Sequence, residues 1–227
     1  MAVFTLTDAV GLLGAYEIDA LANSLSLEAS ADEIEVTTFG DTAHKRIAGL
    51  TDSSWSYEGF ADYDTTGWDS AIFSNLGVAD SITSFAANDS ENEIAYTVRG
   101  VQLTYSAPSG SIGDAATFSL GGSSTEPLRR GRLIQEGETL TATGTSTGYD
   151  EGASQNGNTV YGALHVVSAS GSSPTLDVTV QSDTAGFASP TTVLTFTQAT
   201  GITSEWQTAT VGNTDQWWRA SYTNWWW

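Results

Sequence analysis

Apolar and polar residues alternate along most of the chain with a period of two, which predicts β-strands. The segment 23–38 contains "NSLSLEAS" and "EIEV", in which aliphatic residues alternate with serine and glutamate. The segment 53–64, "SSWSYEGFADYD", continues in the same way, with Gly59 expected at a bulge. In 93–106, "EIAYTVRGVQLTYS", the apolar phase shifts by one residue at Gly100. A bulge or bend is therefore predicted there.

A helical spacing occurs at 65–77, "TTGWDSAIFSNLG". Thr66 is expected to cap this helix with Asp69 three residues later, and Gly77 to end it. Beyond residue 127 only short strands between turns are predicted, which is typical of an antiparallel β-sandwich. These strands are 140–146, 161–170, 175–183, 192–199, 205–211 and 216–223.

A polar stretch rich in glycine, serine and proline at 121–127 marks the predicted domain boundary. The sequence thus predicts a mainly β chain of two domains, 1–125 and 126–227, with one short α-helix in the first domain. The C-terminal domain is expected to be an antiparallel sandwich of Ig-like or jelly-roll-like type. The ending "TNWWW" suggests that this domain is truncated.

Composition narrows the possible functions. The chain carries 27 acidic residues against 7 Lys and Arg, giving a net charge of −20. Residues 1–126 hold 19 acids and 3 bases, and residues 127–227 hold 8 acids and 4 bases. Such a balance argues against gripping a phosphate backbone. The absence of cysteine excludes disulfides and thiolate ligands. We expect no secretory signal and no membrane span.

The sequence contains no recognisable catalytic motif, and no metal or cofactor is expected. His165 is interpreted as a surface or internally hydrogen-bonded strand histidine. Asp62, Asp64 and Gly67 fit the start of a calcium loop, but Phe73 stands where a bidentate glutamate is required. That segment is therefore interpreted as a turn and helix cap.

Positive charge is concentrated in one place in the first half. The passage "TTFGDTAHKRIAGL" at 37–50 holds the chain's single lysine, Lys45, beside His44 and Arg46. In a strongly acidic protein such a cluster indicates either a contact with carboxylates or a solvated hairpin end.

The segment 19–64 resembles the start of tail tube proteins (major tail proteins) of long-tailed, siphovirus-like bacteriophages. The resemblance rests on a strand leading into "TTFGD", a basic patch, an aromatic strand ending near "GFAD", the helix "WDSAIFSNLG" and the strand "AYTVRGVQLTYS". The resemblance continues through 163–201 and "WWRASYT", which match more specifically in wording, whereas the first stretch is the more telling for function. It implies a twisted β-sandwich or barrel domain, six copies per ring, and rings stacked into a tube that conducts DNA out of the capsid.

This resemblance makes the chain a structural, non-enzymatic component of the virion tail, assembled in the host cytoplasm. Its expected partners are copies of itself, other tail proteins and the tape measure protein, with DNA passing through without specific binding. The ring-to-ring contact is expected in a loop from Phe39 to Leu50, at Phe39, Asp41, His44, Lys45 and Arg46. The acidic residues expected to face the channel are Glu28, Asp32, Glu33, Glu35, Glu91 and Glu93.

Two alternatives remain open at this point. The eight tryptophans allow the second half to be a carbohydrate-binding module of a fibre or adhesin, if some of them are exposed. A weaker alternative is a hydrolase that uses two of the many carboxylates.

Overall fold

The computed structural model describes residues 6, 8–61, 68–78 and 80–225. The fold is mainly β, with antiparallel sheets and one short helix, as predicted. The chain forms two compact units. Unit 1 comprises Met1–Asp19, Ile82–Thr97 and Arg129–Trp227, and unit 2 comprises Ala20–Ser81 and Val98–Leu128. Because unit 1 draws on both predicted domains, the division at residue 125 stays a proposal.

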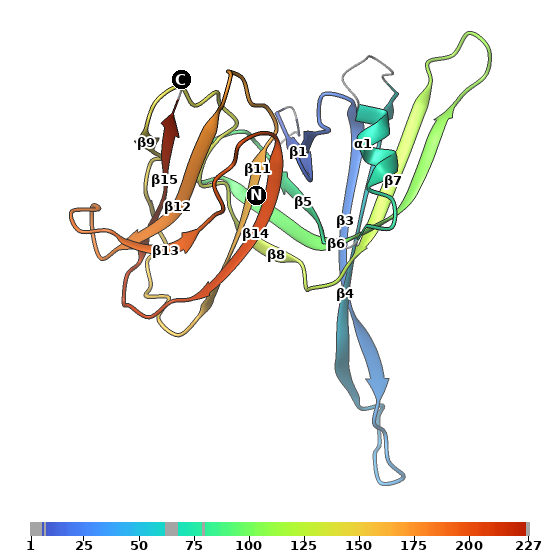
Figure 1. The fold of residues 1–227 in the computed structure, drawn as a ribbon. Helices are drawn as coiled ribbons and strands as arrows, with labels where there is room; N and C mark the ends of the chain where they lie inside the picture. The colour runs from blue at the N-terminus through green and yellow to red at the C-terminus, as the bar shows by residue number, and fades with distance from the viewer. Residues whose placement is uncertain (1–5, 7, 62–67, 79, 226–227) are drawn as a thin grey trace. The chain divides into compact units, whose positions relative to one another are not determined.

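Unit 2 is built around a long antiparallel hairpin (Figure 1). Its elements are β3 (Ala22–Glu35), β4 (Arg46–Phe60), α1 (Trp68–Ser74), β7 (Thr117–Ser124) and most of β6 (Ile94–Ser109). The strands follow the order β6-β7-β4-β3. β7 pairs with β4 only from Ser54 to Phe60, whereas β3 pairs with β4 along almost its whole length.

The core of unit 2 holds the aromatic residues predicted on β4. Trp55 and Tyr57 are almost fully buried, and their rings meet edge to face with centroids 5.9 Å apart. Helix α1 is fixed to β6 through the buried Gln102, whose Nε2 donates to the Ile72 carbonyl at 3.2 Å. A polar side chain is tolerated at this depth because it carries that hydrogen bond.

Helix α1 is shorter than predicted. It ends at Ser74, and Gly77, with φ +77°, lies three residues further, where its N–H donates to the Gln102 carbonyl at 2.8 Å. Thr66, the predicted cap, lies outside the described residues, as do Asp62, Asp64 and Gly67 of the calcium-like segment.

The predicted bulges are displaced from their glycines. In β6 the register with β7 shifts between Gln102 and Thr104, past Gly100. Near Gly59 the shift lies on the partner strand β3, between Ala22 and Ser24. These glycines are required for another reason: a Cβ on Gly100 would lie 2.2 Å from the Ser123 carbonyl oxygen. The glycines allow backbones to approach closely, and the extra residues sit beside them.

Unit 1 contains the predicted sandwich. Its elements are β1 (Val10–Leu13), β2 (Tyr16–Glu17), β5 (Ser81–Ala86, from Ile82), β8 (Arg129–Arg132), β9 (Gly144–Thr145), β10 (Tyr149–Asp150), β11 (Thr159–Val166), β12 (Thr175–Asp183), β13 (Thr191–Thr195), β14 (Thr203–Thr210) and β15 (Trp217–Trp225). One layer has the order β10-β15-β12-β13, with β9 also on β15, and the other is the β11–β14 ribbon. A core of Val178, Val180, Leu194, Phe196, Val211 and Trp218 lies between them.

His165 on β11 is held at both ring nitrogens. Nδ1 lies 2.7 Å from the Gly14 carbonyl oxygen and Nε2 lies 2.8 Å from the Ser84 hydroxyl. A carbonyl only accepts, so Nδ1 carries the proton and Nε2 accepts from Ser84. The ring therefore ties β11 to β5 and to the turn after β1, which agrees with its interpretation as a hydrogen-bonded strand histidine.

We expect Gly122→Ala to destabilise the protein by about 1–3 kcal/mol. The added Cβ would lie 2.3 Å from the Val101 carbonyl oxygen and 2.6 Å from the Trp55 ring. Urea unfolding measures the change. The control is Gly131→Ala, where no atom lies within 4 Å of the new Cβ, and its stability should stay the same or rise slightly. Equal effects from both substitutions would contradict the packing described for β7.

Burial lowers the pKa of His165, and the hydrogen bond to Gly14 only partly opposes this. Because the pKa is depressed in the folded state, the neutral ring contributes stability above the unfolded pKa of about 6.5, and this contribution is lost as pH falls below it. Thermal unfolding between pH 8 and 5 should therefore show a larger loss for the wild type than for His165→Gln. Parallel curves would show that the ring does not titrate with folding.

Candidate functional site

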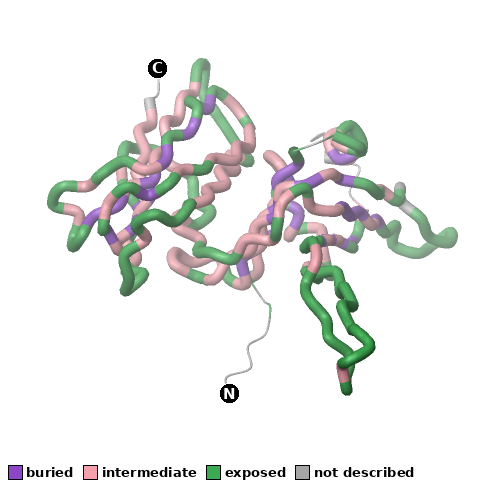
Figure 2. Tube along the Cα trace, turned by 90° about the horizontal axis from the view of Figure 1, so that it is seen from below, coloured by how far each residue is buried: buried purple, intermediate pink, exposed green. Residues whose placement is uncertain are grey.

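The most distinctive feature of unit 2 is the far part of its β3–β4 hairpin, residues 32–50, which we call the distal hairpin. Figure 1 shows these strands continuing past the end of β7, and Figure 2 shows the same stretch exposed along almost its whole length. Only Asp41 and Gly49 within it are partly buried. The distal hairpin is thus a two-stranded ribbon without a covering layer.

The outer edge of β3 is the second feature. β3 ends the strand order of its sheet, so in the described part of the chain no strand pairs with that edge. It is 14 residues long. A long edge with unpaired N–H and C=O groups is a template for pairing with another chain.

The distal hairpin contains a β-bulge, where the register of β3 and β4 shifts. Ala31 is opposite Thr51 and Glu33 is opposite Ala48, so Asp32 faces two residues, Gly49 and Leu50. The extra residue interrupts the regular alternation of the ribbon. The bulge therefore changes which side of the ribbon the residues of β4 face on either side of it.

The basic residues of the distal hairpin pair with acids of the same hairpin. Arg46 Nε lies 2.5 Å from Glu33 Oε1, and His44 Nδ1 lies 2.7 Å from Glu35 Oε1. Lys45 forms an ion pair with Asp41. Exposed ion pairs of this kind contribute little stability individually. Their effect is to hold the turn and the two strand ends in one geometry.

This pairing lowers the pKa of two carboxyl groups of the hairpin, those of Glu35 and Asp41. The hydrogen bond from His44, followed by that from Thr37, lowers the pKa of Glu35. Lys45 and the backbone N–H of Thr38 lower the pKa of Asp41. Each group is therefore held in its charged form by neighbours within the hairpin.

The structure brings all five predicted contact residues to the hairpin end. Phe39 is fully exposed at the turn, and Asp41, His44, Lys45 and Arg46 follow it. The predicted loop 39–50 is shorter than expected, because β4 begins at Arg46. Contact with a second copy stays a prediction, and within one copy the three basic residues already have acidic partners.

The predicted channel acids fall into two groups. Glu28, Asp32, Glu33 and Glu35 lie along β3. Glu91 and Glu93 lie just before β6 and belong to unit 1, where Glu91 accepts a hydrogen bond from the Thr147 N–H at 2.7 Å. On β3, Glu33 is paired with Arg46 and Glu35 is bonded to His44, so Glu28 and Asp32 are the acids there without a described ion pair.

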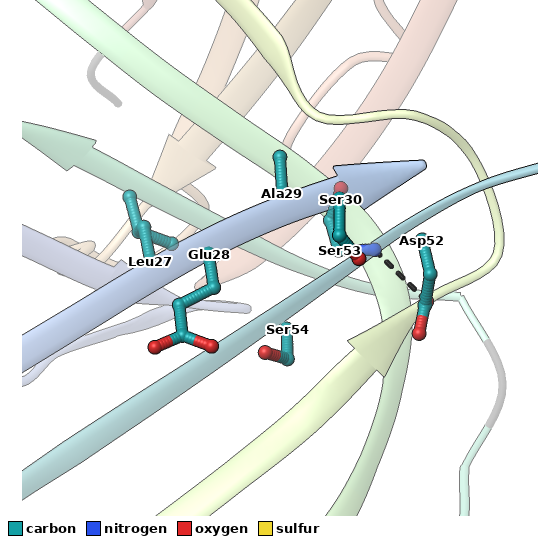
Figure 3. A pocket seen from close by; sticks show the side chains of 7 residues that line it. All are labelled: Leu27, Glu28, Ala29, Ser30, Asp52, Ser53 and Ser54. Carbon is teal, nitrogen blue, oxygen red and sulfur yellow. Dashed lines mark hydrogen bonds between the residues drawn. The ribbon is translucent and has the colours of Figure 1, made fainter. Parts of the chain in front are cut away.

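A shallow groove follows the middle of the hairpin (Figure 3). Apart from Leu27, its walls are small or acidic side chains of β3 and β4, namely Glu28, Ala29, Ser30, Asp52, Ser53 and Ser54. Asp52 Oδ1 accepts from the Ser53 N–H at 2.8 Å. These walls offer few apolar contacts for a small organic ligand, whose sites are mostly lined by apolar side chains.

The carbohydrate alternative requires exposed aromatic rings in the second half. Trp206 and Trp217 are only partly exposed and Trp218 is buried, so no tryptophan described between 129 and 224 is fully presented to solvent. Tyr161 is covered by the Arg129 guanidinium, 3.8 Å from its ring centroid. The described aromatic residues of this half therefore serve packing.

Among the described residues, no cluster of three or more His, Cys, Asp or Glu side chains is placed to hold a metal ion. No described helix is long and apolar enough to cross a membrane.

No protein-family model and no curated protein matches the chain. Among solved structures, similarity is found to the sheath/tube terminator of an extracellular contractile injection system (PVC), with 13% identity, TM-score 0.48, and coverage of 58% of this chain and 98% of that one. The virion of a native gene transfer agent gives 17% identity, TM-score 0.44, and coverage of 57% and 99%. The SPP1 Dit protein, from the adsorption apparatus of phages infecting Gram-positive hosts, gives 10% identity, TM-score 0.39, and coverage of 96% and 99%.

These structural neighbours are components of phage tails and phage-like particles. With TM-scores below 0.5, the similarities establish neither the fold nor the function of this chain.

We expect Asp41→Ala to loosen the hairpin turn, because Asp41 Oδ2 accepts from both the N–H (2.8 Å) and the hydroxyl (3.0 Å) of Thr38. Amide hydrogen exchange at Thr38, measured by NMR, should accelerate several-fold. Asp41→Asn, which keeps an acceptor but loses the ion pair with Lys45, should have a smaller effect.

The same turn should respond to acid. The folded pKa of Asp41 is depressed, so its contribution is present above the ordinary carboxyl pKa and is lost as pH falls through the folded pKa. Thr38 protection that is independent of both pH and Asp41 would contradict this account of the turn.

Proposed function

We propose that this chain is a structural subunit of a phage-type tail tube, in which hexameric rings stack into a conduit for DNA. The observation that carries the proposal is the long unpaired edge of β3, continued by the uncovered distal hairpin. Copies of the same chain that complete the sheet would pair that edge and cover that ribbon. The support comes from these features and from the sequence resemblance, not from the structural similarities.

The acidic composition suits such a conduit. Duplex DNA carries one negative charge per about 1.7 Å of its axis, and a protein that neutralised several phosphates would hold it tightly. A channel lined with carboxylates repels the backbone and lets the duplex slide. Under this proposal Glu28 is the principal channel-facing acid of β3, because Glu33 and Glu35 are paired within the hairpin and Asp32 shares a side with Ile34 at the bulge.

The remaining parts receive matching roles. The distal hairpin, with Phe39 and the three basic residues at its end, makes the contact between successive rings. The C-terminal sandwich lies on the outside of the tube. The partners are further copies, other tail proteins and the tape measure protein, in the virion tail after assembly in the host cytoplasm, and no catalysis is involved.

Negative-stain electron microscopy of the purified protein over a range of concentrations tests the proposal. We expect rings or tubes with an axial hole wide enough for duplex DNA. Glu28→Lys is a second arm, in which assembled tubes should acquire affinity for DNA that falls steeply with added salt. Compact monomers at every concentration, or oligomers without a hole, would refute a tail tube function.

A further inference from the structure

The apolar side chains of the long hairpin switch from one side of the ribbon to the other. Near the sheet, Leu25 is opposite Tyr57 and Leu27 is opposite Trp55, and these residues face the core of unit 2. In the distal hairpin the apolar cross-strand pair is Ile34 opposite Ile47. Since alternate residues of a strand point to opposite sides, the odd-numbered leucines and Ile34 lie on opposite sides of β3.

At the bulge, the apolar residues of β4 change sides together with those of β3. A Cβ built on Gly49 would lie 3.0 Å from Asp32 Cβ and 3.0 Å from Ile34 Cδ1, so these three positions share one side. Ile47, two residues from Gly49 and opposite Ile34, lies on that side too. We call Ile34 and Ile47 the apolar side of the distal hairpin, with Leu50 next to it at the bulge.

The described residues of its own unit leave this side exposed. Ile34 is 46%, Ile47 54% and Leu50 81% exposed. The charged pairs Glu33–Arg46 and Glu35–His44 occupy the other side. Isolated two-stranded hairpins are at best marginally stable in water, and clustered exposed aliphatic side chains mark an interaction surface. The distal hairpin is therefore shaped to be covered from its apolar side.

A second group of exposed apolar side chains occurs in unit 2. Phe73 in the last turn of α1 is 65% exposed, and Leu76 and Val78, which follow the helix, are 41% and 47% exposed. We call these three residues the α1 patch. Leu76 is anchored beside β6 by a bridge to Gln102 and by the adjacent Gly77 N–H, which fixes the backbone under the patch.

The two surfaces lie at opposite ends of unit 2. The chain leaves β4 at Phe60 and enters α1 at Trp68, whereas the distal hairpin is at the other end of the same two strands (Figure 1). One copy therefore cannot bring its own hairpin onto its own patch. Two different surfaces facing opposite ways favour a head-to-tail contact, which repeats from copy to copy.

We propose that the apolar side of the distal hairpin docks onto the α1 patch of a second copy of this chain. The proposal rests on the self-assembly in the proposed function and assigns both surfaces of its stacking contact. The contact is mainly apolar, and beside it the basic residues hold the hairpin end in its geometry through their pairs with Glu33, Glu35 and Asp41.

Substitutions on the two surfaces test the contact. Ile47→Ser and Phe73→Ser should each raise the subunit concentration needed for assembly by about tenfold or more, measured by sedimentation velocity. Ala48→Ser, the next residue on β4 but on the opposite side, is the matched control and should assemble as the wild type does. Phe73→Ser leaves the hairpin unchanged, so its effect cannot be attributed to hairpin unfolding.

Cross-linking gives the second measurement, and it is clean because the chain has no cysteine. The variant Ile47→Cys with Phe73→Cys should form intermolecular disulfide ladders on oxidation, whereas Ala48→Cys with Phe73→Cys should form few. Each single-cysteine variant shows the background.

The outcomes separate the two proposals. Wild-type tubes that are unaffected by Phe73→Ser, or that cross-link equally through residue 48, would overturn the docking contact and leave the tail tube standing. Chains without an axial hole that cross-link through residues 47 and 73 would support the contact and overturn the tube. A wild type that stays monomeric at all concentrations would overturn both.

Discussion

A two-stranded ribbon in water has no core, and this constraint governs the distal hairpin and everything inferred from it. Close to the sheet, the ribbon shares the packing of Trp55 and Tyr57 and gains a third strand, β7. Beyond Ser54, towards the turn, the ribbon has neither that aromatic packing nor a third paired strand. Its geometry is then held by cross-strand hydrogen bonds and by three ion pairs on the surface, each of which contributes little. Under the proposed docking contact, a second copy supplies the missing burial.

The distribution of charge follows from this geometry. Glu33 and Glu35 are alternate residues of β3 and Asp41 follows in the turn, so these carboxylates of the hairpin would repel one another if they were unpaired. Lys45 and Arg46 compensate that charge locally, and His44 bonds to Glu35, which accounts for the basic cluster in this hairpin. The chain as a whole still carries a net charge of −20, most of it outside the distal hairpin, and under the proposed function this charge keeps DNA from adhering.

The sequence predicted the fold where a single strand or helix carries its own signal. The alternation in 23–38 and in the strands beyond residue 127 is confirmed by β3, β11, β12 and β15, and a helix is present at Trp68–Ser74. Bulge positions were less accurate, because a glycine marks a close backbone approach without fixing which strand holds the extra residue. The placement of domains along the chain depends on contacts between distant segments, which local patterns do not encode.

The candidate site was predicted in position but not in chemistry. The basic residues stood out, yet their pairing depends on the register of two strands across a turn. The apolar side was missed although two signals were present. Leucines at odd positions give way to Ile34 and Val36 at even positions, and Gly49 interrupts an apolar run, which is typical of a bulge. Interpreting 39–50 as one loop concealed Ile47 and Leu50 as strand residues.

Amide hydrogen exchange, compared between dilute monomer and assembled protein, tests the central claim most directly. If copies cover the distal hairpin, the amides of residues 32–36 and 46–50 will exchange rapidly in the monomer and will become strongly protected on assembly. The amides beside Trp55 and Tyr57 will be protected in both states. Rapid exchange of the distal hairpin in the assembled protein, or equal protection in the isolated monomer, would contradict the claim that this ribbon is completed by another copy.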